Sequence, residues 1–158
     1  MKYILLISRV LNPEEHPGWD ESVDEKNTQI AISELSWQAY CNERVRLLTH
    51  GKQPAINDLM DSSFPKNWIC ETEDPLSPEI LAQTVCAILI GGTGVELDLA
   101  RRIRNEGFMV WPIASTNGAA GQYLEEALQK DGDFSPETAT MLAMETDYAA
   151  IFERILSL

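Results

Sequence analysis

The chain has 158 residues, of which 44% are hydrophobic and 23% are charged. That length suits a single domain, and that composition excludes disordered and collagen-like proteins. With 12 basic and 25 acidic residues the net charge is −13, which repels nucleic-acid backbones unless basic side chains gather on one face. The one basic cluster, Arg101, Arg102 and Arg104, is interleaved with acidic residues, as is typical of a solvated helix face. DNA and RNA are therefore not expected partners.

Neither a membrane nor an oxidising compartment is indicated. The apolar run Tyr3–Ile7 is too short for a signal peptide, and no small-residue cleavage site follows it. The three cysteines, Cys41, Cys70 and Cys86, are odd in number and lack any Cys-x-x-Cys pairing, which argues against a disulfide framework. The expected location is the cytoplasm.

Strand and helix patterns alternate along the first half of the chain. Apolar runs and near-helical spacings predict a strand at Tyr3–Ile7, a helix from about Asn27 to Asn42, a strand at Val45–Leu48, a helix opened by Pro54 and a short strand at Trp68–Cys70. Between the first two elements lies a polar, Pro-containing loop from Asn12 to about Glu25, which is long enough to act as a lid.

The second half continues the alternation. The same signals predict a helix start at Ser77-Pro78, a strand at Cys86–Ile90, a helix at Val95–Glu106, a strand at Phe108–Ala114, a helix at Gly118–Lys130 and a helical segment from Ser135-Pro136 to the end. This order predicts an α/β fold, a doubly wound Rossmann-like sandwich with a mostly parallel central sheet. We expect residues 1–158 to form one domain, with 131–158 as a C-terminal helical extension.

A glycine-rich loop follows the strand predicted at Cys86–Ile90. In doubly wound sheets, ligands bind beyond the carboxyl ends of the strands. The three glycines of Gly91-Gly92-Thr93-Gly94 permit positive φ angles and a close approach of phosphate to backbone N–H groups. The loop departs from the dinucleotide fingerprint, whose third glycine would fall at Leu97, and it has no Walker lysine. A tight strand-to-helix turn without any ligand is the alternative interpretation.

A second small and polar loop follows the next predicted strand. Its residues Ser115, Thr116 and Asn117 lead directly into a helix, and any of them could serve only as its cap. Two such loops after successive strands favour a ligand site more than either loop does alone.

Residues 87–100 (AILIGGTGVELDLA) and 110–120 (VWPIASTNGAA) resemble the SLOG superfamily of Rossmann-like domains. That superfamily carries a Gly-Gly-x-Gly loop with an acidic helix, then a Pro-containing strand ending in a Thr-Gly-Gly-Ala-Ala-like loop. The resemblance extends more weakly to Leu6–Arg9 and to His50–Ile56, the latter similar to a Gly-Gly-His-Pro-x-Ile turn.

The resemblance implies one of two functions. The enzymatic branch, the LOG-type phosphoribohydrolases, has Pro-Gly-Gly-x-Gly-Thr-x-x-Glu, where this chain has Ile90 for the proline, Val95 for the threonine and Asp98 for the glutamate. The sensor branch is found beside NAD-consuming effectors in bacterial antiviral systems and binds NAD-derived signals such as cyclic ADP-ribose isomers. Its looser motif matches this chain better.

The resemblance also implies a site at the strand ends, in which the glycine loop meets phosphate, the second loop meets phosphate or ribose, and Arg9 supplies positive charge. The expected ligand-binding residues are Ser8, Arg9, His50, Gly51, Gly91, Gly92, Thr93, Gly94, Ser115, Thr116 and Asn117. No catalytic residue is expected in a sensor, whereas in an enzyme Asp98 would be the carboxylate. Glu96 and Asp98 could equally complement the helix dipole. His16 and His50 have no second ligand at metal-binding spacing, so no metal and no cofactor are expected.

The favoured hypothesis is a sensor or sequestering module for a nucleotide- or NAD-derived signal, because binding loops are present and no effector domain is attached. Its expected partners are the small molecule, a second copy of the chain and a separate effector protein. The alternatives are a nucleotide N-glycosidase, phosphoribohydrolase or deoxyribosyltransferase-like enzyme, and an interaction protein with a vestigial pocket.

Overall fold

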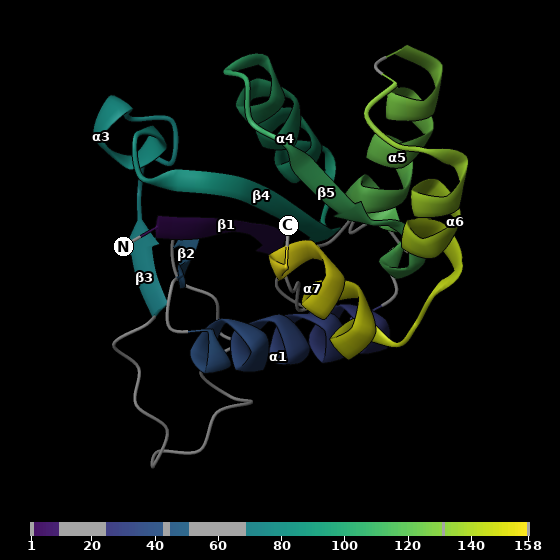
Figure 1. The fold of residues 1–158 in the computed structure, drawn as a ribbon. Helices are drawn as coiled ribbons and strands as arrows, with labels where there is room; N and C mark the ends of the chain where they lie inside the picture. The colour runs from purple at the N-terminus through teal and green to yellow at the C-terminus, as the bar shows by residue number, and fades with distance from the viewer. Residues whose placement is uncertain (1, 10–24, 43–44, 51–68, 131, 158) are drawn as a thin grey trace, which may run out of the picture.

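A computed structural model of the chain describes residues 2–9, 25–42, 45–50, 69–130 and 132–157 (Figure 1). The predicted helix at Pro54 and the predicted lid between residues 12 and 25 lie outside these residues, apart from the last residue of the lid.

The centre of the molecule is a five-stranded sheet in the order β3-β2-β1-β4-β5, in which all neighbouring strands are parallel. The strands are β1 (Lys2–Arg9), β2 (Val45–His50), β3 (Ile69–Thr72), β4 (Thr84–Gly91) and β5 (Val110–Ile113). The predicted Rossmann-like, doubly wound α/β fold is confirmed. Parallel neighbours require crossover connections. A helix at Glu25–Cys41 lies between β1 and β2 in the chain, and a helix at Gly94–Asn105 lies between β4 and β5.

Helices cover both faces of the sheet (Figure 1). One face carries α1 (Glu25–Cys41) and α7 (Tyr148–Leu156), which contact each other. The other face carries α4 (Gly94–Asn105) and α5 (Gly118–Lys130), also in mutual contact. The four-residue α3 (Pro78–Leu81) precedes β4, and α6 (Pro136–Met144) contacts β5 and the 3-10 turn η1 (Ala114–Thr116).

The C-terminal segment forms two helices where the sequence pattern predicted one continuous helical stretch. Glu145 ends α6 in an extended conformation, with ψ at 135°, and the Asp147 carboxylate accepts a hydrogen bond from the Ala150 N–H at 3.2 Å to begin α7. The segment is part of the main core, because Leu142 and Phe152 are fully buried.

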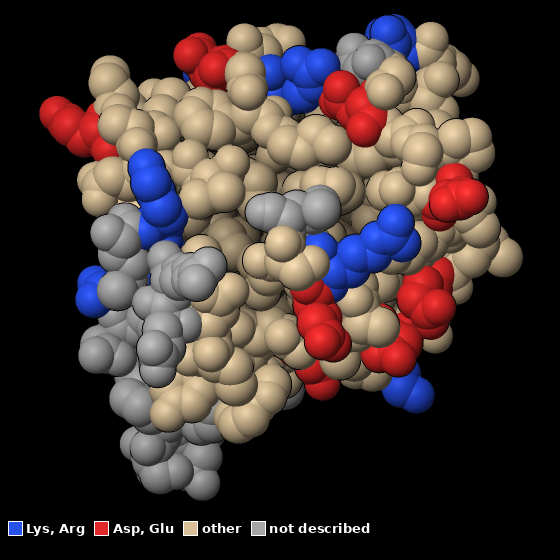
Figure 2. All heavy atoms as spheres, in the orientation of Figure 1, with Lys and Arg blue, Asp and Glu red and all other residues tan. Residues whose placement is uncertain are grey.

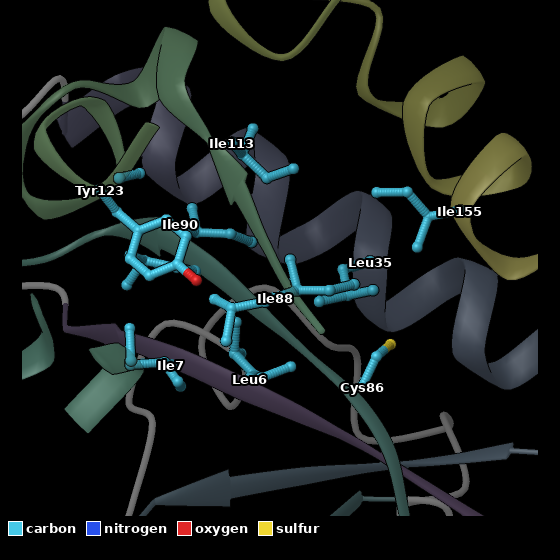
Figure 3. Close-up of a cluster of buried hydrophobic side chains, with 14 of the residues drawn as sticks. Leu6, Ile7, Leu35, Cys86, Ile88, Ile90, Ile113, Tyr123 and Ile155 are labelled. Atoms are coloured by element: carbon cyan, nitrogen blue, oxygen red, sulfur yellow. The ribbon is translucent and has the colours of Figure 1, made fainter. Parts of the chain in front are cut away.

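The core lies on both faces of β1 and β4. Ile4 to Ile7 on β1 and Cys86 to Ile90 on β4 are almost completely buried. Figure 3 shows side chains of α1, β5, α5 and α7 converging on these strands. Such continuous apolar runs are expected of parallel strands covered on both faces. Burial also raises the pKa of the Cys86 thiol to about 11, because a thiolate is poorly solvated there.

Two arginines of α4, on the helix face that the sequence predicted to be solvated, form ion pairs with acidic side chains. Arg101 pairs with Glu126 of α5 through two hydrogen bonds, which lower the pKa of that carboxyl below its usual range. Arg104 binds Asp133 in a bidentate arrangement, at 2.8 and 3.0 Å. On the face shown in Figure 2, Lys and Arg side chains likewise lie among acidic ones. Within the described residues, no helix is long and apolar enough to cross a membrane.

Candidate functional site

The strand order brings the carboxyl ends of β1 and β4 side by side. Chain order reverses between these strands, since β1 leads to β2 on one side and β4 leads to β5 on the other. Ser8 lies opposite Ile90, and Arg9 lies opposite Gly91. Ligands of doubly wound folds bind at this reversal point. The tertiary structure therefore joins two segments of the predicted site that lie about 80 residues apart in the sequence.

Gly92 and Gly94 of the glycine loop differ in how closely the rest of the protein approaches them. Gly91 and Gly92 have φ angles of 54° and 86°, a region that side chains other than glycine rarely adopt. A Cβ atom at Gly92 would lie 2.8 Å from Cβ of Glu96 and 3.4 Å from Cβ of Ala119, so α4 and α5 approach the loop backbone directly. A Cβ atom at Gly94 would meet nothing within 4 Å. Gly94 is therefore the loop glycine that faces open space.

Hydrogen bonds hold the two predicted loops together. The Gly91 N–H donates to the Thr116 hydroxyl at 2.8 Å, and that hydroxyl donates to the Ile113 carbonyl at 2.5 Å. The Ala119 N–H, in the first turn of α5, donates to the Gly92 carbonyl at 3.0 Å. Thr116 is fully buried, so its hydroxyl is committed to positioning the loops in this structure.

Asn117 has the one unusual backbone conformation among the described non-glycine residues, with φ at 61° and ψ at −159°. This region is populated almost only by glycine, and a side chain there costs on the order of 1–3 kcal/mol. Asn117 is exposed and immediately precedes α5. Such strain persists where the surroundings impose it, and it is concentrated at binding and catalytic sites.

Ser115 connects the site to the C-terminal helices. Its hydroxyl lies 3.2 Å from the Tyr148 hydroxyl, at the start of α7. Tyr148 is 2% exposed, whereas Ser115 is half-buried. A ligand hydroxyl group that bound Ser115 would therefore compete with the Ser115–Tyr148 contact. That contact reaches α7, in the same layer of helices as α1.

The two acidic residues of the α4 start have different surroundings. Glu96 is buried, and one of its carboxylate oxygens accepts a hydrogen bond from the Thr93 hydroxyl at 3.1 Å. The Thr93 side chain accepts no cap hydrogen bond from the backbone N–H groups of α4. Asp98 is exposed, on the same outer face as Arg101. The acid beside the glycine loop is therefore Glu96, and the residue predicted as the carboxylate of an enzyme, Asp98, faces solvent.

The remaining predicted residues are placed as follows. Ser8 is buried at the end of β1, and its hydroxyl donates to the Ile90 carbonyl at 2.6 Å. The structure describes the backbone of Arg9 and not its side chain, and Gly51 lies outside the described residues. His50 is exposed at the end of β2, one strand away from the β1–β4 junction.

Sequence reasoning missed one polar group on this side of the protein. Thr28 lies in the early part of α1, and its hydroxyl is completely buried without a hydrogen-bond partner among the described residues. It heads the buried stripe that continues through Ile32 and Leu35, and α1 also contacts η1. The helical spacing of that stripe could have identified Thr28 as an inward-facing polar residue.

Comparisons of the chain with protein-family models, with curated proteins and with solved structures found no match. The resemblance to the SLOG superfamily therefore stays a prediction. Among the described residues, no group of three or more His, Cys, Asp or Glu side chains could hold a metal ion.

Proposed function

We propose that this chain binds a nucleotide- or NAD-derived small molecule where β1 and β4 end, as a sensor or sequestering module. The observation that carries the proposal is the position of the glycine loop at the point where strand order reverses. The helix α4 begins at the end of that loop without a side-chain cap from Thr93, and Gly94 faces open space there. Backbone N–H groups at a helix start bind phosphate through hydrogen bonds and the helix dipole.

Asn117 supports the same proposal independently. Glycine would avoid the backbone strain at this position, and the chain nevertheless has a polar, exposed side chain there. An amide can both donate to and accept from a ribose or a base, so the strain is explained if Asn117 contacts the ligand.

Two variants test the proposal with ADP-ribose, NAD and AMP as probes in titration calorimetry. Asn117→Gly should raise the free energy of unfolding by about 1 kcal/mol, because strain is relieved, and should weaken binding. Gly94→Val should fold normally and weaken binding, because the new side chain occupies the open side of the loop. Asn105→Val, at the other end of α4, is the control and should bind as the wild type does.

Wild-type affinity in both site variants would contradict the proposal, as would a failure of the wild-type protein to bind any of the three probes. Chromatography of the same mixtures tests the enzyme alternative. Release of free base that is lost in Glu96→Gln or Asp98→Asn would replace the sensor function with a glycosidase. A cytoplasmic location, a separate effector protein and a role in antiviral defence stay predictions that accompany this proposal.

A further inference from the structure

A pair of hydroxyl groups joins the C-terminal helix α7 to the second of the two predicted binding loops. The Tyr148 hydroxyl lies 3.2 Å from the Ser115 hydroxyl, and either group can be the donor. Tyr148 is the first residue of α7, whereas Ser115 lies in η1. The two residues are 33 positions apart in the sequence, so the fold brings them together. The sequence analysis did not predict this connection between the C-terminal segment and the site.

Packing fixes the position of the Tyr148 ring. Tyr148 is 2% exposed, and Ile151 and Phe152, one turn further along α7, are buried as well. The Asp147 side chain caps the first turn of the helix. The helix α7 in turn packs against α1 (Figure 1). A buried phenol usually has a hydrogen-bond partner for its hydroxyl, and Ser115 supplies one here.

The Ser115 hydroxyl belongs to a loop that is bonded to the glycine loop. Its neighbour Thr116 accepts a hydrogen bond from the Gly91 N–H, and Asn117 follows, exposed. Ser115 itself is half-buried. A serine hydroxyl has one proton to donate and two lone pairs that accept. Ser115 can therefore bond Tyr148 and a ligand at the same time if it donates to one of them and accepts from the other.

The chemistry of the ligand group decides whether both contacts persist. An ionised phosphate oxygen only accepts hydrogen bonds, so Ser115 would donate its proton to the phosphate and accept from Tyr148. The result is a chain of two hydrogen bonds, from Tyr148 to Ser115 and from Ser115 to the phosphate, in which each bond polarises the next. A ligand hydroxyl that donates to Ser115 would compete with Tyr148 for the serine oxygen.

We propose that Tyr148 is a positioning residue of the site, which directs the Ser115 proton toward a phosphate group of the ligand. The inference rests on the proposed binding function and makes it more specific. The resemblance left open whether the second loop meets phosphate or ribose, and this hydroxyl pair selects phosphate at Ser115. Hydrogen bonds to a charged acceptor are about twice as strong as neutral ones, so a correctly directed proton contributes most there.

Titration calorimetry with ADP-ribose, NAD, AMP and adenosine tests this inference. Ser115→Ala removes the donor and should weaken the phosphate-bearing probes by about tenfold to hundredfold. Tyr148→Phe removes only the group that directs the proton, and should weaken the same probes by about threefold to tenfold. Adenosine has no phosphate and should respond to neither substitution. Tyr3→Phe, at the amino end of β1, is the matched control and should bind as the wild type does.

A double variant separates positioning from a structural role. In a Ser115→Ala background, Tyr148→Phe should not change the affinity further, because its effect passes through the missing serine hydroxyl. A tyrosine needed only for packing would instead weaken every probe in both backgrounds. Circular dichroism melting should show that all variants are folded at the temperature of the titration.

The outcomes distinguish this inference from the proposed function. Phosphate-bearing probes that bind Tyr148→Phe as tightly as the wild type would overturn the inference and leave the proposed function standing. An equal loss of affinity for adenosine, or a further loss in the double variant, would overturn it as well. A wild-type protein that binds none of the phosphate-bearing probes would contradict the proposed function, and this inference with it.

Discussion

Replacing threonine by valine should have opposite effects at two buried positions of this protein. Valine has nearly the shape of threonine, so the substitution removes a hydroxyl group and adds a methyl group with little change in volume. At Thr28 the hydroxyl is buried without a partner among the described residues. At Thr116 the hydroxyl accepts from the Gly91 N–H and donates to the Ile113 carbonyl. The chemistry of the change is the same, and only the surroundings differ.

The magnitudes follow from those contacts. Burying a hydroxyl without a partner costs about 1–3 kcal/mol in proteins, so Thr28→Val should raise the free energy of unfolding by about 1–2 kcal/mol. Thr116→Val removes two hydrogen bonds and leaves the buried Gly91 N–H without this acceptor, which should cost about 2–3 kcal/mol. For a chain of this size, 1 kcal/mol shifts the melting temperature by about 2–4 °C.

Differential scanning calorimetry and urea unfolding measure both effects. We expect the melting temperature to rise by about 2–8 °C in Thr28→Val and to fall by about 4–12 °C in Thr116→Val. Thr140→Val is the control, because Thr140 is exposed on α6 and bonds only within its own helix turn. Its stability should change by less than about 0.5 kcal/mol. If Thr28→Val destabilises the protein as strongly as Thr116→Val, the Thr28 hydroxyl is satisfied in solution and the reasoning is wrong.

Two further predictions concern the loop and the cysteines. Gly92→Ala should destabilise the protein by about 2–4 kcal/mol, since it combines a positive φ angle with a Cβ contact of 2.8 Å, and unfolding near wild-type stability would show that the loop adapts. Exposed Cys41 should react with a thiol reagent within the mixing time at pH 8, while Cys86 should react only on unfolding, because burial raises its pKa to about 11. The protonated Cys86 thiol therefore stabilises the folded protein below the thiol's unfolded pKa, and this contribution is lost as the pH rises toward about 11. Equal labelling rates for Cys41 and Cys86 in the folded protein would contradict the burial of Cys86.

The fold class and the kinds of element could be predicted from residues close together in the chain, because those signals are local. The apolar run at 86–90, which ends at Gly91 and Gly92, predicted a buried parallel strand, which the structure has as β4. Ser77 and Ser135, each before a proline, predicted helix starts, and both side chains accept a hydrogen bond from the N–H three residues later. A cap or an apolar run involves neighbours in the chain, so nearby residues suffice to predict it.

Local patterns were less informative about boundaries. The strand predicted to end at Cys70 extends to Thr72, and the helical stretch after Ser135 is divided by residues 145–147. The apolar spacing continues across that division, because Tyr148 and Ile151 are buried as Leu142 is. Periodicity therefore indicated one helix, whereas the cap at Asp147 divides the segment into two.

Which polar groups face the site could not be predicted from local patterns. Asp98 and Glu96 lie two residues apart, and the packing of α4 buries Glu96 while leaving Asp98 exposed. The hydroxyls of Thr116 and Ser115 are engaged by residues 25 and 33 positions away in the sequence. Such contacts depend on strand order and on which helices share a layer. Strand order and the layer of each helix arise from packing between distant segments, so no single segment of the sequence is enough to predict them.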